Sequence, residues 1–228
     1  MDYEIIATGS TGNATVINRH ILIDCGISFK KLKPYMRELN LVLLTHIHGD
    51  HFKPSTVREL HRQRPSLRFG CCSWMVEPLI DAGVDQRRID VFEPGQSTYI
   101  YGEYDHRFGV RPFPLVHNVP NCGYVITEAN ESVFYATDTG NLDGIKAENL
   151  DLYLIEANHG EAEIQARIEA KLEAGEMAYE TAALENHLSR EQALAWLSEN
   201  MGESSRYVFM HQHVDRGGPE KCQKDITG

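Results

Sequence analysis

Long hydrophobic runs are absent from this sequence, and so is any excess of positive charge. No apolar stretch approaches the ~20 residues that cross a bilayer, and Met1–Glu4 lacks the basic and apolar regions of a secretory signal. The chain has 22 Lys and Arg against 33 Asp and Glu, a formal charge of −11. Such a chain repels polyanions overall, so contact with nucleic acid requires a local patch or bound cations. We expect a cytoplasmic protein with no membrane contact.

Cysteine is scarce and poorly spaced for cross-linking. There are five cysteines, none in a C-x-x-C pair, and Cys71 and Cys72 are adjacent. Such a set fits neither a disulfide framework nor a zinc knuckle, so we expect free thiols in a reducing compartment. The 228 residues, 42% hydrophobic and 24% charged, fit one large globular domain over residues 1–228.

Strand signals dominate the first half of the chain, and helix signals dominate the last third. Runs of β-branched and aromatic residues between turn residues predict strands at 3–8, 14–17, 20–23, 41–45, 69–72, 91–92, 97–101, 110–115, 124–127, 133–137, 152–156 and 207–210. Apolar periodicity and start signals predict helices at 29–39, 54–63, 74–82 (capped by Ser73), 161–174 and 190–200 (with a capping box of Ser189 and Gln192). This alternation predicts layers with helices outside packed sheets.

The segment T-H-I-H-G-D-H at residues 45–51 directly follows the apolar run Leu41–Leu44. Its imidazoles and carboxylate are ligand types that suit zinc and its first-row neighbours. His46 and His48 are two positions apart and share one side of an extended chain. A turn at Gly49 would bring Asp50 and His51 to the same place. A buried polar cluster without an ion would leave its polar atoms unpaired. The candidate metal ligands here are His46, His48, Asp50 and His51.

Three further candidates stand where predicted strands stop, namely His117, Asp138 and His211. Sites in α/β folds are built at such strand ends. A two-metal site needs further histidines and one acid that can bridge ions roughly 3.5–4 Å apart. His213 lies two residues beyond His211 and is the alternative last ligand. We favour His211 because it lies nearer the strand end.

The pattern H-x-H-x-D-H of residues 46–51 resembles the hallmark of the metallo-β-lactamase superfamily, and the likeness runs nearly end to end. The segment L-I-D-C-G at 22–26 resembles a second motif of that superfamily, in which the acid, here Asp24, supports the metal ligands. The resemblance implies a four-layer αββα sandwich of the α/β class, with the metal site at one edge of the two sheets. It also implies one ion held by His46, His48 and His117, another held by Asp50, His51 and His211, and Asp138 as the bridge.

Within the superfamily the chain resembles the single-domain WalJ/YycJ-type DNA exonucleases and, more distantly, the ribonuclease Z enzymes. The segments that carry this likeness are G-S-T-G-N at 9–13, E-A-N-H at 156–159 and H-L-S at 187–189. In this hypothesis a hydroxide that bridges two divalent ions attacks phosphorus, and Asp50 orients it. His187 contacts the scissile phosphate and assists the leaving oxygen, and Glu156 fixes the tautomer of His187. The motifs assign no role to Asn158 or His159.

The leading interpretation is a metal-dependent phosphodiesterase, an exonuclease-like enzyme that acts on DNA ends or a nucleotide with two Zn²⁺ or Mn²⁺ ions. A cyclic-nucleotide phosphodiesterase is an alternative that suits the acidic charge. A hydrolase of small esters or thioesters stays open as well, because metal ligation does not select the substrate. A structural metal domain is less favoured, since structural zinc sites usually close with four ligands. Oligomeric state is left open between monomer and homodimer.

Overall fold

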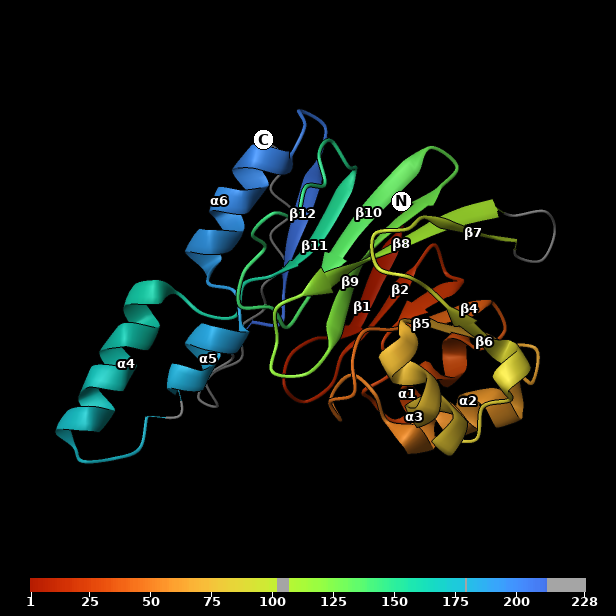
Figure 1. Cartoon of the computed structure of the whole chain (residues 1–228), viewed down its shortest axis with the longest axis horizontal. Coiled ribbons are helices and arrows are strands. Elements are labelled where there is room, and N and C mark those ends of the chain that lie inside the picture. The colour runs from red at the N-terminus through yellow and green to blue at the C-terminus, as the bar shows by residue number, and fades with distance from the viewer. Residues whose placement is uncertain (102–106, 179, 213–228) are drawn as a thin grey trace.

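The computed structural model describes residues 1–101, 107–178 and 180–212, and two six-stranded sheets form its centre (Figure 1). The first sheet contains β1 (Tyr3–Ala7), β2 (Ala14–Ile17), β3 (Ile21–Ile23), β4 (Leu41–Leu44), β5 (Arg68–Cys71) and β6 (Ile89–Val91), in that order. The second sheet runs in the order β12 (Arg206–Met210), β11 (Leu152–Glu156), β10 (Glu131–Ala136), β9 (Asn121–Glu128), β8 (Arg107–Leu115), β7 (Thr98–Tyr101).

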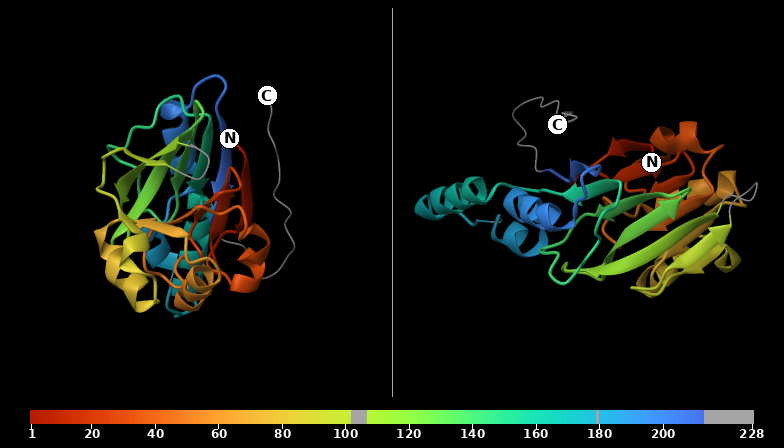
Figure 2. Two further views of the ribbon diagram at one scale, coloured as in Figure 1. Left: turned by 90° about the vertical axis from the view of Figure 1, so that its right-hand side faces the viewer. Right: turned by 90° about the horizontal axis from the view of Figure 1, so that it is seen from above.

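Helices lie on the outer faces of this pair of sheets (Figure 1). The α-helices are α1 (Phe29–Leu32), α2 (Pro54–Gln63), α3 (Val76–Asp81), α4 (Glu161–Glu173), α5 (Glu180–Asn186) and α6 (Arg190–Asn200). Short 3-10 turns occupy Lys33–Tyr35, Ser73–Met75 and Gln86–Arg88. Figure 2 shows that α4 lies apart from the sheets, and α4 and α5 pack on each other through Ile164, Ile168, Ala178 and Ala183.

Alternation of side chains along the strands creates three apolar layers. In β3, Ile21 and Ile23 point between the sheets, whereas Leu22 points to the opposite face and joins the cluster that includes Leu60 of α2. The outer face of the second sheet buries Phe134 in a cluster that includes Leu197 of α6. Helix, sheet, sheet and helix therefore follow one another, which confirms the αββα architecture expected from the sequence.

In each sheet, the strands that precede candidate ligands run in the same direction, so their carboxyl ends lie at the same edge. β3 and β4 run parallel in the first sheet, and β10, β11 and β12 run parallel in the second. β8 has the same direction as β10, because both pair antiparallel with β9. The ends of these strands are followed, within two residues, by Asp24, His46, His117, Asp138 and His211. The strand directions therefore bring these residues to one edge of the sheets.

Two of the predicted helices differ from the observed ones near a proline. The helix predicted at 29–39 is only α1 followed by a 3-10 turn, because Pro34 has no amide hydrogen to continue the α-helical pattern. Ser73 is not the cap of α3, whose N-cap is Met75. A helix begun at Trp74 would place the ring of Pro78 against the carbonyl four residues earlier. The prediction for Ser73 was therefore wrong.

The other helix start that the sequence specified is correct in detail. The Ser189 hydroxyl accepts from the Gln192 amide at 3.0 Å, and the Gln192 side chain accepts from the Ser189 amide at 2.8 Å. This capping box confirms the predicted beginning of α6. The short helix α5 was not predicted.

Four of the cysteines are buried free thiols, namely Cys25, Cys71, Cys72 and Cys122. Cys222 lies outside the described residues. Across the described ranges, no helix combines the length and apolar character that crossing a bilayer requires.

Candidate metal centre

Three histidines form the first half of a donor cluster at the sheet edge. His46 Nε2 lies 3.1 Å from His48 Nδ1, and His117 Nε2 lies 3.2 Å from the same nitrogen. His46 and His48 follow β4 in the first sheet, whereas His117 follows β8 in the second. His48 and His117, 69 residues apart in the chain, therefore meet here, and the three histidines are the group that the family resemblance implied for one ion.

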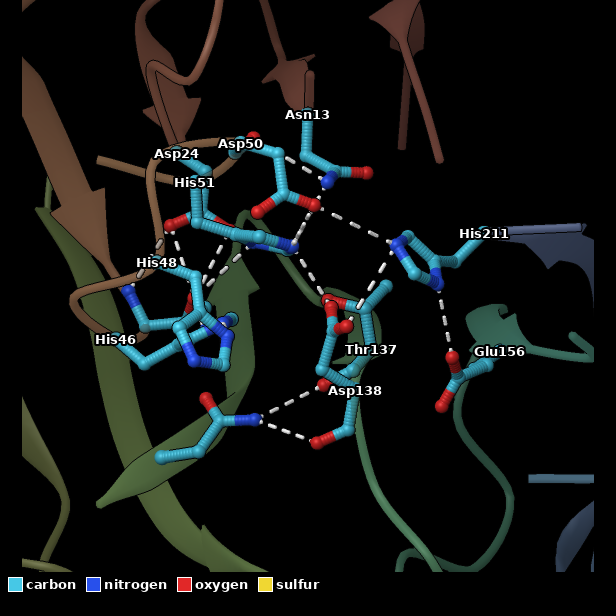
Figure 3. A network of polar contacts seen from close by, with 12 residues as sticks. Asn13, Asp24, His46, His48, Asp50, His51, Thr137, Asp138, Glu156 and His211 are labelled. Carbon is cyan, nitrogen blue, oxygen red and sulfur yellow. Dashed lines mark hydrogen bonds and ion pairs between the residues drawn. The ribbon is translucent and has the colours of Figure 1, made fainter. Parts of the chain in front are cut away.

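Asp50, His51 and His211 form the second half of the cluster (Figure 3). Asp50 Oδ2 lies 3.8 Å from His51 Nε2 and 3.9 Å from His211 Nε2. Asp138 lies between the halves, because one of its oxygens is within 4.8 Å of donor atoms of His46 and His51. Its carboxylate is 2.7 Å from His51 Nε2 and 3.5 Å from His211 Nε2. All seven candidate ligands named from the sequence thus converge on one place.

In four of these imidazoles the ring nitrogen that points away from the cluster, Nδ1, is hydrogen-bonded to an oxygen atom. The Nδ1 atoms of His46 and His51 bond to Thr45 Oγ1 at 3.0 Å and to Asp24 Oδ2 at 2.7 Å. The Nδ1 atom of His117 donates to the Asn186 carbonyl at 3.2 Å. Glu156 accepts in the same way from His211, at 3.0 Å. A proton on Nδ1 leaves the lone pair on Nε2, which points into the cluster, and this is the usual arrangement around metal-binding histidines.

The inward-facing atoms need either a proton or a cation between them. His51 Nε2 and Asp138 Oδ2 are both acceptors once His51 Nδ1 donates to Asp24, yet they lie 2.7 Å apart. Among the described residues, His211 Nε2 and Asp138 Oδ2 are buried without a hydrogen-bond partner. Buried acceptors in this arrangement repel one another and lack hydration. The nitrogen and carboxylate set therefore fits divalent first-row ions.

Two imidazoles of the histidine-rich half, His46 and His117, are neutral at neutral pH. Burial, helped by the nearby His51, lowers the pKa of His46 to about 2. Burial also lowers the pKa of His117, despite the opposing field of Asp138. Imidazoles with so low a pKa keep their lone pairs free at neutral pH, which favours metal binding over protonation.

The acid-rich half attracts positive charge. Burial alone would lower the pKa of His51, but the carboxylates of Asp138 and Asp24 raise it well above its ordinary value. Burial would lower the pKa of His211, but the nearby carboxylates of Asp50, Glu156 and Asp138 outweigh burial and raise it to about 10. These carboxylates therefore hold protons on the histidines when no ion is bound, and an ion would have to displace those protons.

Glu156 joins the cluster to the loops around it. This fully buried carboxylate accepts from His187 Nδ1 at 2.7 Å and from His211 Nδ1 at 3.0 Å. Its second oxygen accepts from the amides of Thr139 at 2.9 Å and Leu188 at 3.2 Å. Burial would raise the pKa of Glu156, but the hydrogen bonds from the two imidazoles outweigh it and the pKa is lowered. One ionised carboxylate thus orients two imidazoles.

The sequence matches a family model described as the beta-lactamase superfamily domain over residues 19–212. The chain belongs to this superfamily. This confirms the family resemblance proposed from the motifs at residues 46–51 and 22–26.

Two curated relatives of this superfamily member are nucleases by name. Exodeoxyribonuclease WalJ of Streptococcus pneumoniae serotype 2 is 31% identical over 173 residues, which covers 69% of this chain and 62% of WalJ. Ribonuclease Z of Phocaeicola vulgatus is 28% identical over 123 residues, covering 47% of this chain and 39% of that enzyme. The chain thus spans less than two thirds of the length of these relatives.

Solved structures share the superfamily fold at low sequence identity. The metallo-beta-lactamase fold protein YhfI of Bacillus subtilis has a TM-score of 0.69 and 18% identity, covering 93% of this chain and 86% of YhfI. Human tRNase Z, short form, has a TM-score of 0.64 and 14% identity, covering 93% and 92%. Zn²⁺-bound PqqB of Methylobacterium extorquens has a TM-score of 0.64 and 12% identity, covering 93% and 88%.

Several supporting residues of this superfamily member escaped sequence reasoning. The Asn121 side chain donates to the carbonyls of Thr137 at 3.1 Å and Asp138 at 2.7 Å and so fixes the turn that carries Asp138. Asn158 donates to the His211 carbonyl at 3.0 Å. The only sequence signal for Asn121 is its place close to a strand end, whereas Asn158 belongs to the E-A-N-H motif, which gave it no defined role.

His159 and His213 are not among the converging donors of the described residues, for different reasons. His159 is buried beside the start of α6, where its carbonyl accepts from the Arg190 amide at 2.8 Å, and its Nδ1 has no partner among the described residues. It is not among the converging donors that the described ranges contain. His213, the alternative last ligand, lies outside the described residues.

Proposed function

We propose that the chain is a metal-dependent phosphodiesterase with two divalent ions, and that it acts as a nuclease on DNA. One ion would be held by His46, His48 and His117, the other by Asp50, His51 and His211, with Asp138 shared between them. When bound, such a pair supplies activation of water at neutral pH and neutralisation of charge on a phosphate. Zn²⁺ and Mn²⁺ both suit this donor set.

The pair of His187 and Glu156 carries the assignment to phosphoryl chemistry. His187 Nδ1 lies 2.7 Å from Glu156, its side chain is 20% exposed, and within the described residues its Nε2 forms no hydrogen bond. Its ring centroid lies 5.2 Å from that of His211 and 5.8 Å from that of His117. A hydrolase whose leaving group is an alkoxide benefits from a proton donor placed beside the metals.

His187 is therefore assigned to contact the phosphate and, with protons on both ring nitrogens, to give its Nε2 proton to the leaving oxygen. Glu156 holds the proton on Nδ1 and orients the ring, so it is a positioning residue. A fourth converging group of donors consists of Asp138, Glu156, His187 and His211. We assign no ion to it, because Glu156 is already hydrogen-bonded to both imidazoles.

Asp50 is assigned a double role. Its side chain is 26% exposed, whereas those of His51 and Asp138 are at most 4% exposed. An accessible carboxylate beside the second group of donors can accept a hydrogen bond from the attacking water while it helps to hold the ion. Asp50 thus orients the nucleophile on the side of the cluster that solvent reaches.

A small substrate is the second candidate, and the helical pair α4–α5 favours it. Residues 161–186 contain seven glutamates against one arginine and one lysine. The end of α5 lies at the centre, where the Asn186 carbonyl accepts from His117 Nδ1. Such an acidic segment would repel a long polyanion close to the site, which favours a cyclic mononucleotide or a short DNA end.

Turnover of four substrates tests the proposal. Metal-loaded protein would be assayed with 5′-phosphorylated duplex DNA, single-stranded DNA, a cyclic mononucleotide and a thioester. We expect the DNA substrates to be hydrolysed fastest, with loss of activity in His187→Ala. Preferential hydrolysis of the cyclic mononucleotide would support the second candidate. Preferential hydrolysis of the thioester, undiminished in His187→Ala, would refute the phosphodiesterase assignment.

A further inference from the structure

The loop between β1 and β2, residues 8–13, contacts every donor of one half of the centre. It reaches Asp50 and His51 through Asn13, and it reaches His211 through Thr8. Within the described residues, no hydrogen bond joins this loop to His46, His48 or His117. We propose that the loop positions the second ion selectively. This inference rests on the two-ion assignment proposed above.

Asn13 contacts two consecutive ligands of that half. Its backbone amide donates to the Asp50 carbonyl at 2.6 Å, and its side-chain Nδ2 lies 2.7 Å from His51 Nε2 (Figure 3). The side chain is fully buried, and its Oδ1 accepts from the Gly9 amide at 2.9 Å. The amide group is therefore held in one orientation by the loop itself.

The Asn13 amide also suits the state in which an ion occupies the Nε2 lone pair of His51. Its Nδ2 lies 3.2 Å from the Gly9 carbonyl and 3.3 Å from the Asp50 carbonyl. The two amide hydrogens thus have two carbonyl acceptors that remain when His51 binds a cation. The side chain can therefore hold the Asp50 carbonyl while a cation occupies His51.

Two glycines allow the loop to approach this closely. Gly12 has φ of +146°, and a Cβ there would lie 2.6 Å from Ile27 Cγ2. A Cβ on Gly26 would lie 1.7 Å from the Asp50 carbonyl oxygen. The Gly26 amide donates to the Asn13 carbonyl at 3.0 Å, so the loops of residues 8–13 and 24–26 together enclose the Asp50 peptide.

Thr8 supports the remaining ligand. Its hydroxyl accepts from the His211 backbone amide at 2.7 Å. His211 has φ of +49°, a left-handed conformation that is unfavourable for a residue with a side chain and must be held by its surroundings. The Asn158 side chain holds the His211 carbonyl at 3.0 Å. Thr8 thus helps to keep His211 directed toward Asp50.

Stepwise metal titration tests this inference. Apo forms of the full chain, wild type, Asn13→Ala and Thr8→Val, would be titrated with Zn²⁺ by calorimetry, and bound zinc would be counted by mass spectrometry. Thr8→Ser keeps the hydroxyl, and Ser10→Ala changes an exposed position of the same loop. Circular dichroism would verify that each variant is folded.

We expect the wild type, Thr8→Ser and Ser10→Ala to bind two equivalents. In Asn13→Ala and Thr8→Val the second equivalent should bind about 10–100-fold more weakly, as found for residues that support metal ligands, with the first unchanged. Equal weakening of both equivalents, or no change, would overturn the selective role of the loop. A wild type that cannot bind two equivalents would overturn the two-ion assignment itself, a distinct result.

Discussion

Replacement of Glu156 by glutamine probes the group on which both the metal centre and the proposed proton donor depend. The carboxylate receives four hydrogen bonds, two from imidazoles and two from backbone amides. Glutamine keeps the shape but offers one acceptor oxygen and an NH₂ group. If its oxygen keeps the amides of Thr139 and Leu188, its NH₂ faces the Nδ1 atoms of His187 and His211.

The imidazoles would then have to accept at Nδ1 and carry their proton on Nε2. His187 could then not hold protons on both nitrogens, as its role as a proton donor requires, and His211 would lose the lone pair that faces the cluster. In a serine protease the equivalent carboxylate-to-amide change lowers kcat about 10⁴-fold through the wrong tautomer. We expect a loss of about 10³–10⁴-fold here, with metal affinity lowered about 10–100-fold.

The assay is hydrolysis of a DNA phosphodiester, whose leaving group is an alkoxide, at saturating metal, which separates the kinetic effect from weakened metal binding. Nitrogen-15 NMR of the histidines would report the tautomers directly. Glu163→Gln, which removes an exposed carboxylate from α4, is the matched control and should retain wild-type activity. The reasoning is refuted if Glu156→Gln retains more than a tenth of wild-type kcat, or if its imidazole tautomers are unchanged.

Three further predictions concern the donors, the ions and the thiols. Asp50→Ala and His187→Ala should both abolish phosphodiester hydrolysis, but only Asp50→Ala should reduce bound metal; full activity in His187→Ala would exclude its catalytic role. Removal of metal by a chelator should lower the melting temperature, because each ion present at 100 times its Kd adds about 2.7 kcal/mol to the free energy of unfolding; an unchanged melting curve would contradict structural coupling. Burial raises the pKa of Cys71 to about 12, and the other three described cysteines are buried as well, so at most one thiol should react promptly with a disulfide reagent at pH 8, and five should react after denaturation; prompt reaction of several thiols would refute the buried positions.

The sequence predicted the ligand-bearing strand ends well, because that information is local. A short apolar run followed by a polar cluster, as at Leu41–Leu44 and residues 45–51, specifies both a buried strand and the point where it stops. The family motifs then supplied the layer order, which strand periodicity alone does not determine. The capping box of α6 was correct for the same local reason.

The features of the site that the sequence did not predict depend on contacts between segments distant in the chain. The position of His187 follows from α5, a short helix without a strong start signal in the sequence. The left-handed conformations of Asp24, Asp138 and His211 arise only when neighbouring loops hold their backbones, so no propensity predicts them. The role of Asn13 requires its loop to lie against Asp50, 37 residues away.

Anomalous diffraction from crystals grown with Zn²⁺ or Mn²⁺ would test the two-ion centre most directly. The account predicts two peaks roughly 3.5–4 Å apart, with Asp138 in contact with both and three further donors around each. A single peak, or two peaks that Asp138 does not join, would contradict it.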